Sequence, residues 1–466
     1  MGLVFLCLFV LAEVAIVVLT FTKCSEMSKF LKNRALVTAT EFILLTLMVL
    51  LPTTYMKWRF VCALAVLFVR AMIAGVSYLV KGKKEQNIVK KPARIISSVL
   101  AVVLMAFSLM PAFMFSNYNG LEVTGEYEIS ECNAILIDKN RNDTFENDGS
   151  SREVPVHFYY PKTEGEFPFV IFSHGAFGYY QSNYSTYAEL ASNGYIVAAL
   201  DHPHHAFFTT DSNGKMIIVD NNFFETAMNI ANPDVMSESE TFQISQQWLK
   251  LRTEDESFVL DTIKEAKERG SLSECWITDA ENDVITVLSM INTDKIGLMG
   301  HSMGGATAVA LGRVRNDIDA VINLDGSMLS EIKSVNNGEF EYFNEPYSVP
   351  VLDFRKQEDY NEIEQLLNNG ISVNDNGIIA DNYAYGFAYV NNYIMENAEN
   401  GKSVVFENAG HMDFTDLPMF SPFLGSVLGS ETEDCKEFMY TVNSVVLNWF
   451  DYYLKGEGTL NIQAKY

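Results

Sequence analysis

The chain has 466 residues and is therefore longer than one typical domain. Of its residues 48% are hydrophobic, and its formal net charge is −26 at pH 7. The charge is unevenly divided, because residues 1–116 carry a net charge of +9 and the remaining residues carry −35. An acidic C-terminal part of this size argues against nucleic acid and strongly anionic polymers as partners.

Residues 1–116 are predicted to form a four-helix transmembrane domain. They hold four apolar stretches, at 2–22, 35–56, 60–80 and 95–115. Each is about 20 residues long, which is the length that a helix needs to cross a hydrocarbon core of about 30 Å. The first stretch lacks the basic start and the obvious cleavage site of a signal peptide, so it is interpreted as a span.

The basic residues between the predicted spans set their expected orientation. The connectors 23–34 and 81–94 hold four and six Lys or Arg residues, whereas the middle connector holds only Lys57 and Arg59. Because connectors rich in Lys and Arg stay in the cytoplasm, the N-terminus and everything after the fourth span are predicted to lie on the extracytoplasmic side. The chain is then an integral membrane protein with an outer C-terminal domain.

Two charged residues are predicted to pair inside the transmembrane domain. Glu13 and Arg70 lie 11 and 10 residues from the starts of their spans. Since both starts are on the outer side, the two side chains reach nearly the same depth, and charges at that depth are costly unless paired. Glu41 is a weaker candidate partner, because it lies near the cytoplasmic start of the second span and its side chain can extend to the interface.

After the spans the sequence changes to an α/β pattern. Residues 117–150 are polar and are interpreted as a linker or an edge strand. Residues 151–466 alternate apolar strand patterns with helical ones, which predicts a mostly parallel sheet covered by helices. An insertion at about 206–250 lies where such folds carry a lid. The insertion contains Phe207, Phe208, Phe223 and Phe224. These side chains are expected either to receive an acyl chain of the substrate or to pack the insertion itself.

The segment 296–306 ends an apolar run with Gly-His-Ser-Met-Gly and passes directly into a helical pattern. Gly-x-Ser-x-Gly between a strand and a helix is typical of the nucleophile elbow of an α/β-hydrolase, in which the Ser stands on a sharp turn. Gly300 and Gly304 are expected where a Cβ atom would clash in that turn. Ser302 is therefore the predicted nucleophile.

A Ser hydroxyl needs a His to take its proton and a carboxylate to orient that His. In this fold the chain order is Ser, then the acid, then His. Of the seven histidines only His411 follows Ser302, and it lies in a loop after the mostly apolar run 403–406. His411 is therefore the predicted general base.

Two places offer the carboxylate. Asp325 follows the segment 320–324, whose only polar residue is Asn323, and catalytic groups of parallel sheets gather at such carboxyl ends. Glu358 and Asp359 follow the next strand pattern, 349–354, where many other α/β-hydrolases carry the acid. On spacing alone both places remain open.

Five stretches together form a specific pattern, namely Phe-Ser-His-Gly (172–175), the segment 190–202, Phe-Val-Leu-Asp (258–261), Gly-His-Ser-Met-Gly-Gly (300–305) and Asn-Leu-Asp-Gly-Ser-Met (323–328). This pattern resembles the plasma-type platelet-activating-factor acetylhydrolases and their bacterial relatives near the dienelactone hydrolases. The resemblance implies an α/β-hydrolase fold and an esterase or lipase acting on small-molecule or lipid esters. It also implies Asp325 as the triad acid, with Asp359 or Glu358 in reserve.

The same resemblance implies an oxyanion hole, in which backbone N–H groups bind the charge that develops on a carbonyl oxygen. One donor is Met303, next after the nucleophile, and the other is Ala176, in the loop after the strand 169–172. The residues beside these donors are expected to contact the substrate, and they are His174, Gly175, Phe177 and His301.

Asp201, His202, His204 and His205 form a cluster that invites a metal interpretation. Adjacent side chains diverge and no second ligand group follows, so these residues are expected to pack the loop or to line the pocket mouth rather than to bind zinc. No pattern indicates a cofactor, and a Ser-His-Asp triad needs none.

The sequence leaves three points open. A peptidase or a thioesterase would use the same triad, because the fold does not set the leaving group. A non-catalytic membrane protein with a hydrolase-like binding domain is a rival of another class. The three cysteines of the outer part permit at most one disulfide, and no pattern indicates the oligomeric state.

Overall fold

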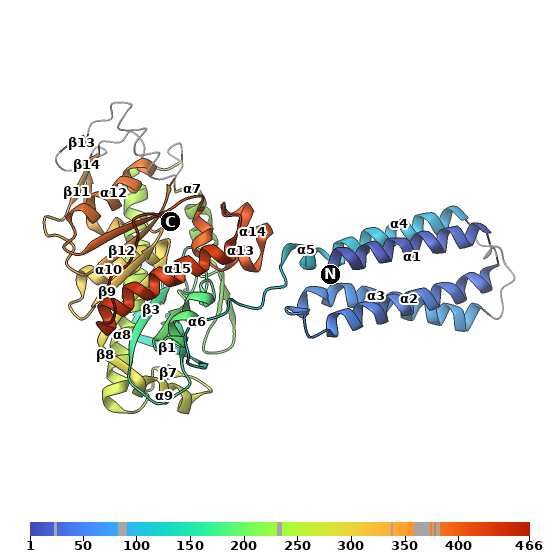
Figure 1. Cartoon of the computed structure of the whole chain (residues 1–466), viewed down its shortest axis with the longest axis horizontal. Helices are drawn as coiled ribbons and strands as arrows, with labels where there is room; N and C mark the ends of the chain where they lie inside the picture. The colour runs from blue at the N-terminus through green and yellow to red at the C-terminus, as the bar shows by residue number, and fades with distance from the viewer. Residues whose placement is uncertain are drawn as a thin grey trace. The chain divides into compact units, whose positions relative to one another are not determined.

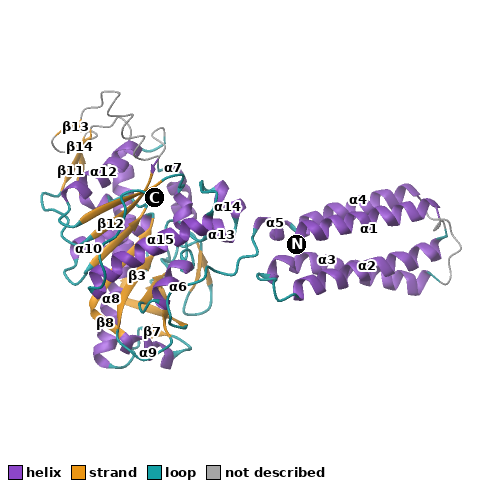
Figure 2. Cartoon of the chain, viewed as in Figure 1, coloured by secondary structure: helices purple, strands orange, loops and turns teal. Residues whose placement is uncertain are grey.

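The computed structural model describes residues 1–22, 26–82, 91–230, 235–336, 339–357, 373–374, 377–378 and 383–466. These residues form two compact units. Met1–Gly120 and Leu417–Val427 make up the helical unit, and Leu121–Asp416 and Leu428–Tyr466 make up the sheet unit. Figure 1 labels the elements of each unit, and Figure 2 shows a bundle of helices in the first and a helix-covered sheet in the second.

The described part of the helical unit begins with α1 (Gly2–Thr22), α2 (Met27–Leu50), α3 (Val61–Lys81) and α4 (Lys91–Ser108). Short helices complete it, namely η1 (Lys57–Phe60), α5 (Met110–Met114), α13 (Leu417–Phe420) and α14 (Pro422–Val427). Three helical segments are long and apolar enough to cross a membrane: Gly2–Phe21, Met27–Leu50 and Lys57–Lys81. Only 22–28% of each apolar window is buried inside the protein. Because most of the apolar side chains are thus left outside the bundle, the three helices indicate membrane association.

A small apolar interior holds these helices together. Phe5 and Phe9 of α1 are buried against Leu45 of α2, Leu67 of α3 and Met105 of α4. The two phenylalanines are four residues apart and therefore lie on one face of their helix. Each helix thus uses one stripe for internal packing and leaves its other faces to an apolar surrounding.

The fourth predicted span is shorter than expected. The continuous apolar helix in this region is Pro92–Ser108, and the next helix starts only at Met110. Pro111 explains the break, because proline lacks the N–H that bonds to the carbonyl four residues earlier and its ring clashes there. Within the described residues the unit therefore has three helices of spanning length and one shorter apolar helix, rather than four equal spans.

The predicted pairing of Glu13 with Arg70 is confirmed. The Arg70 guanidinium donates a hydrogen bond to the Glu13 carboxylate, and the two side chains are only 12% and 5% exposed. Glu41 was the weaker candidate, and the hydrogen bond of Arg70 goes to Glu13. Because α2 begins at Met27 and not at residue 35, Glu41 lies in the middle of its helix, where it is 5% exposed, and its place relative to a membrane interface stays a prediction.

A charge swap tests the ion pair. Glu13→Arg alone or Arg70→Glu alone leaves two like charges in an apolar bundle, so each variant is expected to lower the amount of membrane-inserted protein several-fold. The double swap restores opposite charges and is expected to restore insertion to near the wild-type amount. Quantitative immunoblotting of the membrane fraction measures both effects. Two defective single variants without rescue in the double variant would mean that the two charges serve separate partners.

The described residues of the sheet unit are built around a nine-stranded sheet with the order β15-β12-β9-β8-β3-β4-β2-β1-β7. Its strands are β1 (Ile129–Asn142), β2 (Ser151–Pro161), β3 (Phe167–Ser173), β4 (Ile196–Leu200), β7 (Trp276–Ile277), β8 (Ile291–His301), β9 (Ala320–Leu324), β12 (Val351–Lys356) and β15 (Gly401–Phe406). From β15 to β4 the neighbours are parallel, whereas β2, β1 and β7 continue in antiparallel pairing. The sheet is therefore mostly parallel, as predicted.

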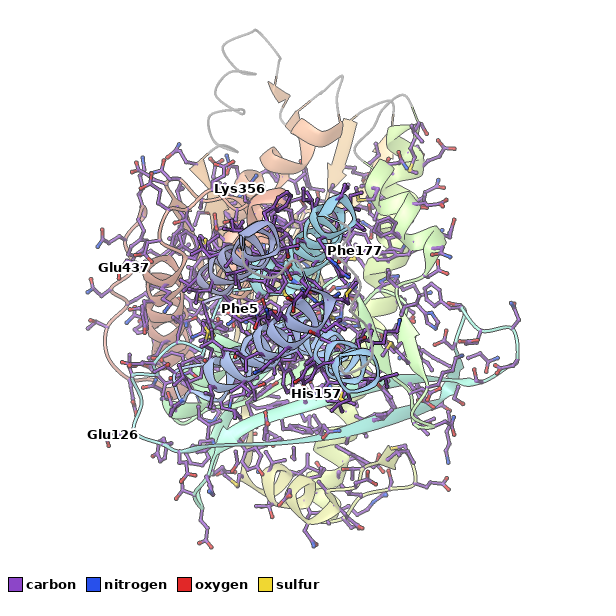
Figure 3. All side chains as sticks on the ribbon, turned by 90° about the vertical axis from the view of Figure 1, so that its right-hand side faces the viewer. Phe5, Glu126, His157, Phe177, Lys356 and Glu437 are labelled. Atoms are coloured by element: carbon purple, nitrogen blue, oxygen red, sulfur yellow. The ribbon has the colours of Figure 1, made fainter. Side chains whose placement is uncertain are left out.

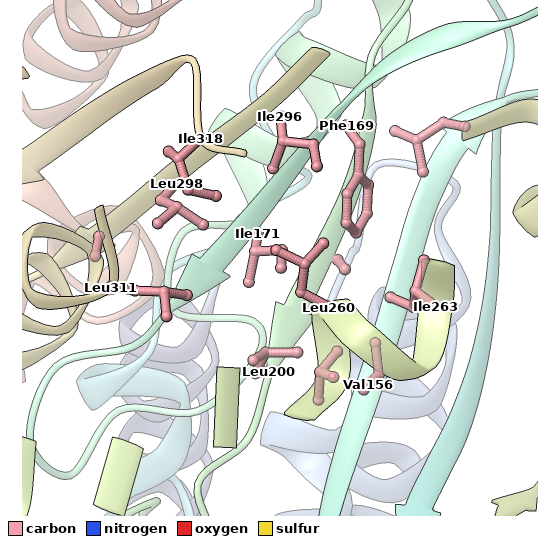
Figure 4. Packing of buried hydrophobic residues seen from close by; sticks show 14 of the residues in the cluster. Val156, Phe169, Ile171, Leu200, Leu260, Ile263, Ile296, Leu298, Leu311 and Ile318 are labelled. Carbon is pink, nitrogen blue, oxygen red and sulfur yellow. The ribbon is translucent and has the colours of Figure 1, made fainter. Parts of the chain in front are cut away.

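Helices cover this sheet, namely α6 (Tyr184–Ser192), α8 (Glu238–Arg269), α9 (Glu281–Met290), α10 (Met303–Val314), α12 (Tyr383–Asn397) and α15 (Cys435–Phe450). Leu260 and Ile263 of α8 share one buried core with Ile171 of β3 and Leu298 of β8 (Figure 4). These strand residues are buried because the strands of a parallel sheet are covered on both faces. The arrangement confirms the predicted α/β-hydrolase fold.

Smaller elements follow the strands of the second half. They are η2 (Leu329–Glu331), β10 (Ile332–Asn336), β11 (Glu339–Tyr342), β13 (Val373–Asn374), β14 (Gly377–Ile378), η3 (His411–Phe414) and the π-helix η4 (Asp451–Lys455). β10 pairs with β11 and β13 pairs with β14, both antiparallel. Each pair forms a two-stranded sheet separate from the main sheet.

The structure describes two segments for which the sequence left more than one interpretation. The segment 117–150 contains β1, which pairs with β2 along its length and is second from the sheet edge. The insertion at 206–250 contains a hairpin of β5 (Phe208–Thr210) and β6 (Met216–Ile218), the helix α7 (Asn221–Asn229) and the first turns of α8. The last part of this insertion is thus the start of a long core helix.

The three cysteines of the sheet unit are free thiols. Cys132 is buried in β1, and Cys275 and Cys435 are half-buried. Burial raises the pKa of the Cys132 thiol to about 12, so this side chain stays protonated at neutral pH and packs as a small apolar group. The sequence allowed one disulfide among these residues, and the structure has none between them.

Candidate active site

Ser302 stands on the turn between β8 and α10. Its backbone has φ 54° and ψ −122°, a conformation that residues with a side chain rarely adopt. A Cβ atom on Gly300 would overlap the backbone of Gly304, and a Cβ atom on Gly304 would overlap the carbonyl of Ser173. Close backbone approach therefore requires both glycines, as predicted. The local structure is the strand, sharp turn and helix of a nucleophile elbow.

Strand register brings Asp325 to the same edge of the sheet. β8 and β9 are parallel, and His301 lies opposite Leu324. Ser302 follows His301 directly in the chain, and Asp325 follows Leu324. The Ser302 N–H donates to the Leu324 carbonyl over 2.8 Å, so the two predicted catalytic residues follow neighbouring strands at one level.

Asp325 and His411 are in direct contact. The His411 Nδ1 lies 2.5 Å from the Asp325 Oδ2, and the two side chains are 38% and 5% exposed. Because a carboxylate only accepts hydrogen bonds, the proton of the neutral ring is on Nδ1, and Nε2 is left free to act as a base. The alternative acids Glu358 and Asp359 lie outside the described residues.

His301 lies between the elbow and the loop of His411. Its Nε2 is 3.0 Å from the His411 carbonyl oxygen, and the two ring centroids are 4.6 Å apart. Burial lowers the pKa of His301 to about 3, so the ring is neutral at physiological pH and Nε2 donates its proton to that carbonyl. His301 thus supports the backbone of His411, while its contact with a substrate stays a prediction.

The loop after β3 passes next to the nucleophile. A Cβ atom on Gly175 would lie 3.2 Å from the Ser302 Cβ. The Ala176 N–H has no hydrogen-bond partner among the described residues. Met303 is the first residue of α10, where an N–H has no acceptor within the helix. Neither predicted oxyanion donor thus has an acceptor for its N–H among the described residues, and their binding of a ligand oxygen stays a prediction.

His174 holds this loop from inside. Its ring is fully buried, and Nδ1 lies 2.6 Å from the Gly175 carbonyl oxygen. The His202 N–H donates to His174 Nε2 over 3.1 Å, so the proton of the ring is on Nδ1. Burial lowers the pKa of His174 well below its usual range, which keeps the ring neutral. The His174 ring thus positions the loop.

Phe177, which is labelled in Figure 3, lies in the same loop and contacts the insertion. It is half-buried with φ 61°, and its ring centroid lies 5.4 Å from that of Phe223 and 5.1 Å from that of Phe224. Phe223 is 2% exposed and packs the insertion, whereas Phe207 and Phe224 are 60% and 45% exposed. Packing of the insertion is thus confirmed for Phe223, and a role of the others in receiving an acyl chain stays a prediction.

A buried polar network supports the turn that carries Asp325, and the sequence analysis missed it. The Asn323 side chain accepts from the Gly326 N–H and donates to Asp353 over 2.8 Å. Asn391 also donates to Asp353, over 3.1 Å. Burial raises the pKa of Asp353 to about 6, and Arg355 opposes this shift. The available signal was Asn323, the one polar residue in an otherwise apolar strand.

The cluster at 201–205 forms separate contacts. Asp201 accepts from the Tyr180 N–H over 2.7 Å. His202 places Nε2 2.7 Å from the Ser173 hydroxyl and Nδ1 3.0 Å from Asp255. Burial lowers the pKa of His202 to about 4. These side chains diverge, and those of Asp201 and His202 pack the loop, one of the two roles expected from the sequence.

Comparison with known proteins places these residues in a family context. A family model described as platelet-activating factor acetylhydrolase, isoform II, matches residues 145–456, a range that contains Ser302, Asp325 and His411. The platelet-activating factor acetylhydrolase of Bos taurus is 29% identical over 157 residues, which are 32% of this chain and 32% of that protein. That of Cavia porcellus is 30% identical over 167 residues, 34% of this chain and 35% of that protein. The chain spans about a third of the length of the curated relatives it matches.

A solved structure is also similar to this chain. Ferulic acid esterase from Streptomyces cinnamoneus matches with a TM-score of 0.49 and 18% sequence identity. The match covers 73% of this chain and 94% of that chain.

Proposed function

The chain belongs to the platelet-activating factor acetylhydrolase, isoform II, family, and from this premise we propose that its sheet unit is a serine hydrolase of carboxylic esters. The observation that carries the proposal is the 2.5 Å contact of His411 Nδ1 with Asp325 Oδ2, at the sheet edge where Ser302 stands on its turn. Ser302 is the proposed nucleophile, His411 the base and Asp325 the acid that orients it.

The proposed reaction has two acyl-transfer steps. His411 Nε2 takes the proton of the Ser302 hydroxyl, and the oxygen attacks the ester carbonyl carbon. The N–H groups of Met303 and Ala176 stabilise the charge on the carbonyl oxygen. The bond to the alcohol oxygen breaks, and the alcohol leaves with the proton from His411. Water then attacks the acyl ester on Ser302 in the same way, which releases the acid and restores the hydroxyl.

We infer that the substrate is a small-molecule or lipid ester. Phe177 and Phe224 offer aromatic surface next to the proposed oxyanion donor Ala176, which suits an apolar acyl group. The curated relatives are named acetylhydrolases, which favours a short one. No residue of the proposed mechanism needs a cofactor.

A substrate panel tests the reaction class. The detergent-solubilised full chain is assayed with p-nitrophenyl esters from acetate to palmitate, with matched thioesters and with peptide amides. Ser302→Ala supplies the background rate for each compound. We expect the esters to give the highest kcat/KM, with the short acyl groups first. Thioester or amide cleavage without ester cleavage would make the protein a thioesterase or a peptidase, and no turnover above background would contradict the proposal.

We further propose that the chain is an integral membrane protein whose sheet unit lies on the extracytoplasmic side. Three helical segments of spanning length support the membrane part of this proposal. The larger number of basic residues in the connectors 23–34 and 81–94 supports the orientation. Such a tether keeps the site close to amphiphilic esters.

Thiol labelling in intact cells tests this orientation. In a chain whose native cysteines are replaced by serine, a membrane-impermeant maleimide is expected to label a cysteine introduced at Ser150, because that site is outside. A cysteine introduced at Gln86 is expected to stay unlabelled until the cells are lysed, and lysis is the control for reactivity. The reverse pattern would place the sheet unit in the cytoplasm.

A further inference from the structure

Arg252 of α8 is buried directly behind the loop that follows β3. We propose that Arg252 is a positioning residue for ester hydrolysis, which aims the Ala176 N–H at the substrate oxygen by holding the two peptide carbonyls that precede it. This inference rests on the proposed function and adds to it a residue from a helix that supplies no member of the proposed triad.

The contacts of Arg252 converge on this loop. The side chain is fully buried. Its Nη1 donates to the carbonyl of His174, and its Nη2 donates to the carbonyl of Gly175 over 3.4 Å. Its Nε donates to His205 Nδ1 over 3.2 Å. Because a guanidinium is a planar fork of fixed donors, these contacts hold both carbonyls in one arrangement.

The direction of the Ala176 N–H follows from the Gly175 carbonyl. That carbonyl accepts from His174 Nδ1 over 2.6 Å, from the Gly178 N–H over 3.1 Å and from Arg252 over 3.4 Å, so three donors fix it. In a trans peptide the carbonyl of one residue and the N–H of the next point in opposite directions. The Ala176 N–H is thereby turned away from the guanidinium. It is also the N–H that lacks a partner among the described residues, in a loop that passes next to Ser302.

The neighbours of Arg252 keep it charged and in place. Burial lowers the pKa of Arg252 to about 9, and Asp255 and Glu256 oppose this shift, so the guanidinium is charged at neutral pH. His205 stacks on Phe223 with 3.9 Å between the ring centroids. Burial lowers the pKa of His205 well below its usual range, which leaves Nδ1 as an acceptor for the Nε proton.

Arg252→Met tests the inference, because Met fills the space of the apolar stem and removes every guanidinium donor. With the best ester of the panel and the full chain, kcat is expected to fall about 10²-fold to 10³-fold while KM changes less than about threefold, since an oxyanion donor acts in the transition state. Arg252→Lys is expected to recover part of the loss, because an ammonium cannot hold both carbonyls as a fork does. The affinity for phenylboronic acid, whose adduct with Ser places an oxygen at the oxyanion position, is expected to fall with kcat.

Arg152→Met is the matched control. Arg152 is 1% exposed, and its guanidinium bonds to Asp143 and Asp255 without a hydrogen bond to the His174 or Gly175 carbonyl in the described chain. Its loss is expected to lower Tm, yet the folded protein should keep kcat within about threefold, because no oxyanion donor is affected. A role of Arg252 in stability alone would give the two variants the same kinetics.

His205→Phe keeps the inference testable if Arg252→Met does not fold. The phenyl ring can stack on Phe223 as the imidazole does, but it offers no acceptor to Arg252. We expect kcat to fall about tenfold at an unchanged KM, with weaker binding of phenylboronic acid. A wild-type kcat in folded Arg252→Met, or in His205→Phe where the first variant is unfolded, would overturn the inference. A wild-type chain that hydrolyses no ester would instead overturn the proposed function, so the two failures are distinguishable.

Discussion

Ser302→Ala is expected to lower kcat for ester hydrolysis by about 10⁴-fold or more, because the acyl-enzyme cannot form without the hydroxyl oxygen. The fold is expected to survive the change. Ser302 is the N-cap residue of α10, but its side chain makes no capping hydrogen bond, so the helix does not depend on the hydroxyl. Tm is therefore expected to stay close to that of the wild type.

His411→Ala is expected to cause a loss of the same order, since the proposed triad acts as a unit. Initial rates with a p-nitrophenyl ester and thermal unfolding of the same preparations measure both quantities. A double variant that lacks Ser302 and His411 serves as the control and is expected to be no slower than either single variant. If a variant with a normal Tm kept more than about a tenth of the wild-type kcat, the roles of Ser302 and His411 would be wrong.

Asp325→Asn is expected to lower kcat by about 10²-fold to 10³-fold, a large loss but smaller than that of Ser302→Ala. Asp325 accepts from His411 Nδ1 over 2.5 Å, which keeps Nε2 free. An Asn side chain can present its amide N–H₂ to Nδ1 and thereby favour the tautomer with the proton on Nε2. That tautomer cannot take the proton of Ser302.

Asp359→Asn is the comparison for this variant. We expect its kcat to stay within about twofold of the wild type, because Asp325 already holds His411. Tm is measured for both variants, so that a loss of folded protein is not counted as a loss of catalysis. If Asp359→Asn were inactive and Asp325→Asn were close to the wild type, the triad acid would be Asp359 and not Asp325. The spacing of the sequence alone allowed both.

Several elements were predictable because their signals lie within one stretch of the sequence. The predicted strand 320–324 coincides with β9 (Ala320–Leu324), and the predicted first span 2–22 coincides with α1 (Gly2–Thr22). In each of these two segments the pattern of apolar residues indicates a single secondary-structure assignment. The start of α2 was missed by eight residues, since Lys29, Lys32 and Arg34 interrupt the apolar pattern although the helix continues through them.

The supports of the site were not predictable, because they join residues that are distant in the chain. Arg252 reaches the carbonyl of Gly175 across 77 residues, and Asn391 reaches Asp353 across 38. Periodicity marks which face of an element is buried, but it does not name the partner on that face. The available signal in α8 was the placement of Arg252 and Glu256 in the stripe of Leu249 and Val259, where charges are rare unless paired.

The most direct test of the proposed function is labelling of the full chain with a fluorophosphonate probe, followed by mass spectrometry of the modified peptide. The probe reacts with a Ser only where a neighbouring base and an oxyanion hole activate it. We expect one modified peptide, with the adduct on Ser302, and no labelling of Ser302→Ala under the same conditions. An unlabelled wild-type chain, or an adduct on another residue that persists in Ser302→Ala, would contradict the assignment of this protein as a Ser302-dependent hydrolase.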